Sequence, residues 1–241
     1  MIVKNDITIK QIISLANSTI KIIKMNCTLC STFLSEKADV DYYICPNCNA
    51  YLKRDDLYFD EANEKNHYEQ HNNDVNDIGY QNFTAPVTNT ILENCTTEML
   101  GLDYGCGKGP VISKQLLEKG YRVDLYDPYF YPDTSYLHKT YDYIFSCEVF
   151  EHFYNPVEEI SKLFSILKQS GLLIVKTHLY NNQTDFKNWY YRKDQTHVFI
   201  YTFKTFEYIA EHFGFDIVTL EEKLVVLKKH SANLILRSYV S

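Results

Sequence analysis

Four cysteines near the start of the chain are arranged in two closely spaced pairs. Cys27 and Cys30 form the first pair, and Cys45 and Cys48 form the second. A Cys-x-x-Cys turn presents two thiolates together, and two such turns complete the closed tetrahedral shell of a structural zinc ion. The alternative is a redox dithiol, but redox Cys-x-x-Cys motifs usually occur singly and near a βαβ unit. The spacing therefore predicts a zinc ribbon, which we place at residues 25–53.

A glycine-rich turn follows a short apolar stretch in the middle of the chain, and a helical pattern follows the turn. Its spacing is Asp-x-Gly-x-Gly-x-Gly, from Asp103 through Gly105 and Gly107 to Gly109. Glycines let the backbone adopt positive φ and approach a ligand closely, and Pro110 suits the first position of a helix. The dinucleotide fingerprint places its third small residue one position later, which counts against NAD. The turn therefore predicts a site for an adenosine-containing cofactor.

This turn resembles motif I of the class I S-adenosylmethionine-dependent methyltransferases, and the resemblance covers about residues 99–228. In that family an acid after the next strand hydrogen-bonds the cofactor ribose, and Asp127 stands at this position. The alternative is that Asp127 only opens a turn before Pro128. The resemblance implies that S-adenosylmethionine is held by Asp103, Gly105, Cys106, Gly107, Gly109, Asp127, Cys147 and Glu148.

Two glutamates and a histidine follow a buried strand further along the chain. They are Glu148, Glu151 and His152, and they lie at the carboxyl end of the strand, where ligands bind in parallel α/β sheets. The Glu-x-x-Glu-His pattern resembles that of the ubiquinone-pathway O-methyltransferases and of the 2′-O-methyltransferases that act on small-RNA 3′ ends. Both families have a downstream histidine, here His197. The resemblance implies that Glu148, Glu151, His152 and His197 hold a divalent metal.

The metal in such a set would be Mg²⁺ or another divalent ion, and it would hold substrate hydroxyls and lower their pKa. The alternative needs no metal. In that case His152 or His197 acts as the general base, because the ordinary pKa of histidine is near neutrality. The stretch from Trp189 to His197 also resembles small bacterial proteins that pair an N-terminal zinc ribbon with a methyltransferase domain.

Strand-like and helical patterns alternate from residue 99 onward, as in a parallel sheet covered on both faces. A later hairpin at residues 215–227 resembles the antiparallel end of the methyltransferase sheet. We therefore expect an α/β, Rossmann-like doubly wound sheet with a terminal antiparallel hairpin, plus the small zinc ribbon. Residues 128–141 are too short for a full helix and strand, so the third αβ unit is expected to be missing or abbreviated. The expected strands are 122–126, 143–147 and 172–175, and the expected helices begin at 110, 156 and 203.

The composition predicts a folded cytoplasmic protein. The 241 residues are 45% hydrophobic, and no apolar run approaches the roughly 18 residues of a membrane span. The N-terminal stretch lacks the cleavage site of a secretory signal. The expected parts are a variable extension (1–24), the ribbon (25–53), a connector or lid (54–98) with Tyr68, His71 and Tyr80 as lid candidates, and the methyltransferase domain (99–241).

These patterns predict a methyltransferase that acts on a small molecule bearing hydroxyl groups. One alternative is an RNA-modifying enzyme whose ribbon contacts nucleic acid, which the net charge of −7 disfavours. The other alternative is a non-enzymatic sensor or scaffold that binds the cofactor. The intact turn and the Glu/His cluster count against the last alternative.

Overall fold

The computed structural model of the chain describes residues 25–69 and 74–231. The predicted extension 1–24 and the lid candidate His71 lie outside these residues. Within the described ranges, no helix is at once long enough and apolar enough to cross a membrane.

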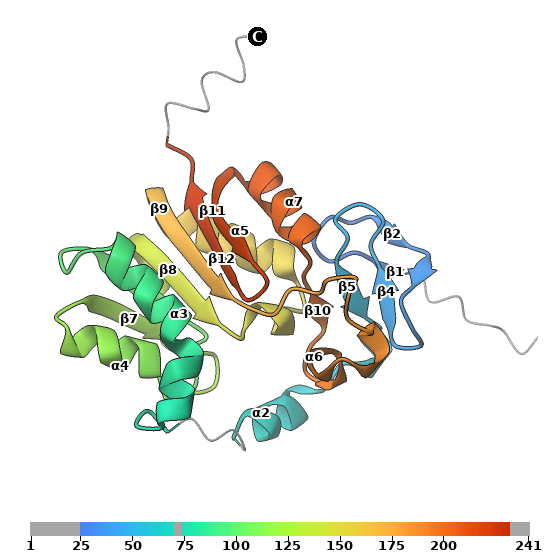
Figure 1. Cartoon of the computed structure of the whole chain (residues 1–241), viewed down its shortest axis with the longest axis horizontal. Coiled ribbons are helices and arrows are strands. Elements are labelled where there is room, and N and C mark those ends of the chain that lie inside the picture. Colours follow the sequence, from blue (N-terminus) through green and yellow to red (C-terminus); the bar gives the residue numbers. More distant parts are fainter. Residues whose placement is uncertain (1–24, 70–73, 232–241) are drawn as a thin grey trace, which may run out of the picture.

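A six-stranded sheet forms the centre of the molecule (Figure 1). Its spatial order is β11-β12-β9-β8-β6-β7, with four parallel strands at one end and an antiparallel hairpin at the other. This arrangement confirms the predicted doubly wound fold with a terminal hairpin. The strands are β6 (Leu100–Tyr104), β7 (Arg122–Tyr126), β8 (Tyr141–Cys147), β9 (Leu167–Lys176), β11 (Phe215–Glu221) and β12 (Leu224–Lys229).

Helices cover both faces of this sheet. α3 (Ile78–Asn94) and α4 (Val111–Glu118) pack on one face through Val87, Ile91 and Leu116. α5 (Pro156–Ile166) and α7 (Phe203–Phe213) pack on the other face. Burial of apolar side chains on both sides explains why the parallel strands are apolar along most of their length.

Local signals fix the ends of α7. The Thr202 side chain accepts a hydrogen bond from the backbone of Thr205, and the Thr205 side chain accepts one from the backbone of Thr202. This capping box satisfies donors that the first turn of a helix leaves unpaired. Gly214 then adopts φ of 84°, the left-handed conformation that ends many helices. The helix therefore has the predicted bounds.

Two helix ends and one helix cap differ slightly from what the sequence patterns favour. α4 begins at Val111, so that Pro110 precedes its first residue. α5 ends at Ile166, and Leu167 starts β9 instead of extending the helical face. Asn155 precedes α5 but forms no side-chain cap hydrogen bond. Between β7 and β8 the chain forms only the short helix η2 (Thr134–His138), which confirms the abbreviated third unit.

The first 29 described residues form small antiparallel sheets around the four cysteines, and we call residues 25–53 the four-cysteine module. A three-strand sheet in the module gains a fourth strand, β10, from the far end of the chain, in the order β10-β5-β4-β3. The strands are β1 (Met25–Asn26), β2 (Phe33–Leu34), β3 (Glu36–Lys37), β4 (Tyr42–Ile44), β5 (Tyr51–Lys53) and β10 (Phe199–Ile200).

The module and the central sheet share one hydrophobic core. Cys45 and Leu52 of the module belong to the same buried cluster as Leu163, Phe206 and Ile209 of the helices on the sheet. The predicted division at residue 53 therefore does not separate two independent cores.

The predicted connector also contains part of the main domain. α3 covers one face of the sheet, so this domain begins before residue 99. The preceding helix α2 (Glu61–Glu69) lies below the sheet in the view of Figure 1. The remaining short helices are η1 (Asp55–Leu57), η3 (Phe150–His152), η4 (Phe186–Asn188) and α6 (Tyr190–Lys193).

Candidate functional site

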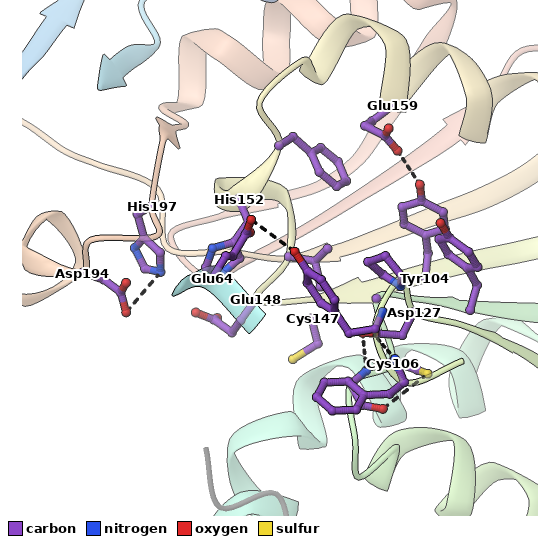
Figure 2. A pocket seen from close by; sticks show the side chains of 18 of the residues that line it. Glu64, Tyr104, Cys106, Asp127, Cys147, Glu148, His152, Glu159, Asp194 and His197 are labelled. Carbon is purple, nitrogen blue, oxygen red and sulfur yellow. Dashed lines mark hydrogen bonds and ion pairs between the residues drawn. The ribbon is translucent and has the colours of Figure 1, made fainter. Parts of the chain in front are cut away.

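A cavity of about 670 Å³ lies at the carboxyl ends of the parallel strands. Figure 2 shows Cys106 and Asp127 at one end of it and Asp194 and His197 at the other. Its volume is within the range of about 300–1,000 Å³ that small-ligand sites occupy. Of the residues proposed from sequence, the cavity is lined by Gly105, Cys106, Gly107, Asp127, Cys147, Glu148, His152 and His197.

The glycine-rich turn makes one end of the cavity. Gly105 and Gly107 have φ of 79° and 65°, so both use the conformational freedom of glycine. A Cβ on Gly105 would lie 2.5 Å from a methyl carbon of Val149, which leaves no room for a side chain. Gly109 is neither a positive-φ residue nor part of the cavity wall. The prediction of positive φ was therefore wrong for Gly109, whereas its contact with a ligand stays a prediction.

Asp127 fixes the loop that faces this turn. Its Oδ2 accepts a hydrogen bond from the backbone N–H of Gly107 at 3.0 Å. Its Oδ1 accepts from the N–H groups of Tyr129 at 2.9 Å and Phe130 at 3.0 Å. The side chain thus opens a turn, as the alternative interpretation of Asp127 held, and it also lines the cavity.

Asp103 lies behind the turn, outside the cavity wall. Its Oδ2 accepts a hydrogen bond from the Ser113 hydroxyl of α4 at 2.6 Å, and the side chain is buried. The structure therefore makes Asp103 an anchor for the helix, and its contact with a cofactor stays a prediction. The pKa of Asp103 is raised to about 7, mainly by burial and also by the nearby Asp127, although the hydrogen bond from Ser113 lowers it.

We predict that Asp103→Asn makes stability less dependent on pH. The pKa of Asp103 rises on folding from 3.8 to about 7, so the folded protein holds a proton that the unfolded chain releases. Stability from this group is full below about pH 4 and is lost as pH rises to about 7. Unfolding midpoints measured from pH 4 to 8 should fall less with rising pH in the variant. An unchanged pH slope would refute the assignment of this carboxyl.

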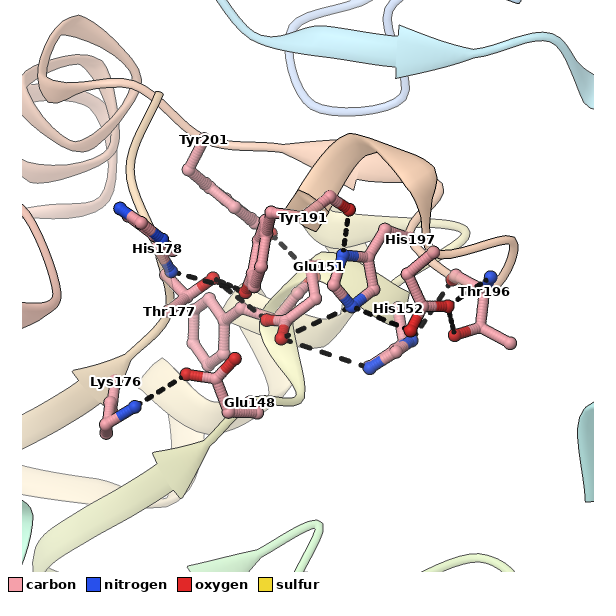
Figure 3. Close-up of polar contacts among 12 residues, drawn as sticks. Glu148, Glu151, His152, Lys176, Thr177, His178, Tyr191, Thr196, His197 and Tyr201 are labelled. Atoms are coloured by element: carbon pink, nitrogen blue, oxygen red, sulfur yellow. Dashed lines mark hydrogen bonds and ion pairs between the residues drawn. The ribbon is translucent and has the colours of Figure 1, made fainter. Parts of the chain in front are cut away.

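Three side chains converge at the other end of the cavity. Ligand atoms of Glu151, His152 and His197 lie within 4.8 Å of one another (Figure 3). Glu151 Oε1 is 3.9 Å from His152 Nε2 and 4.0 Å from His197 Nε2. η3 carries the first two residues, and the segment between α6 and β10 carries the third. The predicted proximity of these three residues is thus confirmed.

Glu151 is fully buried, and only one of its two carboxylate oxygens accepts a hydrogen bond from the described residues. Its Oε2 accepts a hydrogen bond from the Thr177 hydroxyl at 2.9 Å. Its Oε1 has no hydrogen-bond partner among the residues that the structure describes. A buried carboxylate oxygen without a partner costs free energy, so such an atom points to a missing partner.

Both imidazoles turn the same nitrogen toward this oxygen. His152 Nδ1 faces the Thr196 carbonyl at 3.1 Å, and His197 Nδ1 faces the Tyr191 carbonyl at 2.7 Å. A carbonyl only accepts hydrogen bonds, so each Nδ1 carries the proton and each neutral ring presents a lone pair at Nε2. Burial lowers the pKa of both rings. The His197 Nε2 also lies 3.9 Å from Asp194 Oδ2, so electron-rich atoms face one another.

Glu148 does not join this group. Its carboxylate accepts a hydrogen bond from Lys176 Nζ at 2.8 Å, and its backbone has φ of 55°. The pKa of Glu148 is raised to about 7, mainly by burial and also by the nearby Glu151, although Lys176 lowers it. The structure therefore leaves Glu148 outside the convergent group, because the buried ammonium of β9 pairs with it, and its role as a fourth metal ligand stays a prediction. Glu148 still lines the cavity.

The cavity wall also contains residues that the sequence patterns did not single out. Glu64 of α2 accepts hydrogen bonds from the hydroxyls of Tyr154 at 3.0 Å and Tyr129 at 3.3 Å. These partners lie 65 and 90 residues away in sequence, so no local pattern could indicate them. Of the lid candidates, Tyr80 lines the cavity, whereas Tyr68 belongs to α2 without a described side chain.

The four cysteines converge as predicted, within the four-cysteine module and outside the wall of this cavity. Their Sγ atoms lie within 4.8 Å of one another, with Cys27 and Cys48 3.5 Å apart and Cys30 and Cys45 3.3 Å apart. These separations exceed the roughly 2.05 Å of a disulfide. The two pairs have the same backbone geometry, because Ser31 and Asn49 each follow a pair with φ of 60°. Their N–H groups donate to the carbonyls of Cys27 and Cys45.

Comparison with known proteins identifies the fold family. The structure is similar to 1,6-didemethyltoxoflavin-N1-methyltransferase of Burkholderia thailandensis, solved with its substrate and S-adenosylhomocysteine. Identity is 11%, coverage is 82% of this chain and 100% of that chain, and the TM-score is 0.52. Human N-acetylserotonin methyltransferase, solved with S-adenosylmethionine, is 12% identical over 71% of this chain and 57% of that chain, with a TM-score of 0.48. At these identities the likeness concerns the fold alone.

A sequence search of curated proteins found no match. Residues 78–220, more than half of the chain, match the family described as a methyltransferase domain. The match begins at the first residue of α3 and ends inside the terminal hairpin, so it contains the whole parallel sheet and every residue of the cavity wall except Glu64. The chain therefore belongs to the methyltransferase domain family.

Proposed function

We propose that the chain is an S-adenosylmethionine-dependent methyltransferase that methylates a hydroxyl group of a small molecule. The observation that carries this proposal is the cavity, which joins the glycine-rich turn and Asp127 at one end to His152 and His197 at the other, where Glu151 lies next to the two rings. The Burkholderia thailandensis neighbour, whose structure contains S-adenosylhomocysteine, supports the cofactor assignment. The aromatic wall, which includes Tyr129, suits a flat organic acceptor.

The two ends of the cavity would have different tasks. Methyl transfer requires mainly that the acceptor oxygen approach the sulfonium methyl in line and lose one proton. In this proposal the turn and Asp127 hold the cofactor, because the glycines let a ligand approach the backbone closely and the carboxylate suits the hydroxyls of a ribose. His152 and His197 lie at the far end and face the acceptor.

The group of Glu151, His152 and His197 fits a divalent metal. Glu151 Oε1 has no hydrogen-bond partner, and the two Nε2 lone pairs face the same point. Metal-bound histidines typically donate their other N–H to a carbonyl, as both do in this structure. One carboxylate and two imidazoles suit Zn²⁺, Mn²⁺ or Fe²⁺ better than the all-oxygen preference of Mg²⁺. Such an ion would lower the pKa of an acceptor hydroxyl.

The proposal is tested by binding first and by product analysis second. Calorimetry should show binding of S-adenosylhomocysteine and no binding of NAD. A lysate supplied with the enzyme and methyl-labelled S-adenosylmethionine should then yield label in a small-molecule fraction. Binding of NAD alone would refute the cofactor, and label confined to RNA would refute the small-molecule acceptor.

We also propose that Cys27, Cys30, Cys45 and Cys48 bind one zinc ion. Elemental analysis should give one equivalent in the as-purified protein under conditions that leave the Glu/His group empty. Replacing Cys45 with Ser should remove this zinc. Because the module shares its core with the central sheet, the variant should also lower the unfolding midpoint of the whole chain. Folded, metal-free protein with four readily alkylated thiols would contradict the assignment.

A further inference from the structure

The segment that carries His197 lies between the main domain and the four-cysteine module. On the main-domain side, the Val198 N–H donates to the Glu151 carbonyl at 2.9 Å. On the module side, Phe199 and Ile200 of β10 pair with Leu52 and Tyr51 of β5. Figure 1 shows α6 and β10 beside β4 and β5. The position of His197 thus depends on residues more than 140 positions earlier in the chain.

Tyr42 contacts His197 directly. Its hydroxyl donates a hydrogen bond to the His197 carbonyl at 2.6 Å, and only 1% of the side chain surface is exposed. Burial raises the pKa of Tyr42 above its usual range, so the phenol remains a donor at all physiological pH values. The bond fixes the backbone from which the imidazole extends.

Lys53 holds the residues on either side of His197. Its Nζ donates to the Gln195 carbonyl at 2.5 Å, and its backbone N–H donates to the Val198 carbonyl at 2.9 Å. Lys53 is a buried lysine, and burial lowers its pKa. Lysine is rarely buried, because an ammonium without partners is costly in the interior. Its place beneath the His197 segment therefore indicates a specific task for its donors.

Arg192 anchors the start of the same segment. Its Nε donates to Asp39 Oδ2 at 2.8 Å, and its Nη2 donates to Asp41 Oδ2 at 2.5 Å. The guanidinium also lies over the ring of Tyr42, 5.0 Å from the ring centre. Charge-assisted bonds of this kind are stronger than neutral ones and fix the orientation of the planar group.

We infer that Tyr42, Lys53 and Arg192 are positioning residues that hold the His197 segment in place, so that the four-cysteine module supports the methyl-acceptor site from outside the cavity. That this end of the cavity receives the methyl acceptor rests on the function proposed above. The cofactor end of the cavity has its own support within the central sheet, such as the bond from the Gly105 N–H to the Tyr126 carbonyl at 2.8 Å. Loss of the module contacts should therefore change one end of the cavity and spare the other.

The test uses the full-length protein with one equivalent of zinc. Tyr42→Phe removes a single oxygen, and Lys53→Met removes the ammonium. Tyr43→Phe is the matched control, because Tyr43 is also buried and lies on the same strand. Diethyl pyrocarbonate acylates neutral imidazole, and mass spectrometry reports the rate at each histidine. The exposed His212 serves as an internal reference.

We expect each test variant to raise the modification rate of His197 by about fivefold, the opening expected when one hydrogen bond is lost. Amide exchange of residues 194–199 should rise with it, while zinc content and the affinity for S-adenosylhomocysteine stay close to those of Tyr43→Phe and the unfolding midpoint falls by no more than the about 2–4 °C that one lost hydrogen bond implies. If Tyr42→Phe fails to fold, Lys53→Met alone decides. An unchanged His197 rate, or a rate that rises equally at every buried histidine, overturns the inference. Failure of wild-type protein to bind S-adenosylhomocysteine would instead overturn the proposed cofactor and leave the His197 result standing.

Discussion

Asp127→Ala is expected to weaken S-adenosylhomocysteine binding by about 10- to 100-fold, which corresponds to about 1–3 kcal/mol for leaving polar groups unpaired. The carboxylate has two tasks that the alanine cannot perform. It holds the N–H groups of Gly107, Tyr129 and Phe130, and it lines the cavity where a ribose would lie. Calorimetric titration of the folded variant measures the loss.

A second substitution is the control for removing a carboxylate outside the cavity. Asp124 lies on β7 and accepts hydrogen bonds from Lys139 and Tyr141, outside the cavity wall. Asp124→Ala should therefore reduce stability without a large effect on cofactor affinity. If both variants bind the cofactor as tightly as the wild type, Asp127 is only a turn residue and the ribose assignment fails.

The elements that the sequence predicted well are those with local signals. α7 begins at a Thr that caps it and ends at a Gly with positive φ, and both features are encoded within the helix. The glycine-rich turn and the hairpin are similar cases. The absence of a third αβ unit followed from chain length alone, since residues 128–141 leave no room for it.

The elements that were missed depend on distant partners. α3 contains Pro86 and many polar residues, so its sequence resembles a connector, yet Val87 and Ile91 pack on the sheet. β10 has only two residues and becomes a strand because β5 provides its partner. No periodicity within either segment can indicate such docking.

The candidate site shows the same contrast. Glu151, His152 and His197 were brought together only by resemblance to known families, and the structure confirms that they meet. Glu148 was included for the same reason, but its direction is set by Lys176, a buried residue on another strand. Whether Glu148 can join the convergent group thus depends on Lys176, a partner 28 residues away.

Glu151→Gln and His197→Ala are expected to abolish binding of a second divalent ion. Loss of residues that only support a ligand weakens metal sites by about 10- to 100-fold, so loss of a ligand itself should exceed about 100-fold. The measurement is a cobalt(II) titration of protein whose cysteine site is filled with zinc, followed by visible absorption. Both variants should bind S-adenosylhomocysteine normally, because neither residue contacts the glycine-rich turn.

Glu148→Gln is the matched control for this prediction, because the structure places Glu148 on Lys176 and outside the convergent group. It should bind cobalt within a few-fold of the wild type. Equal loss in Glu148→Gln and Glu151→Gln would restore the four-ligand set and contradict the geometry found here. If the wild type takes up no second ion, the unpartnered Glu151 oxygen needs another explanation, and His152 or His197 would then act as a metal-free base. In that case His152→Ala and His197→Ala should still lower turnover far more than cofactor affinity, because both rings lie at the acceptor end of the cavity.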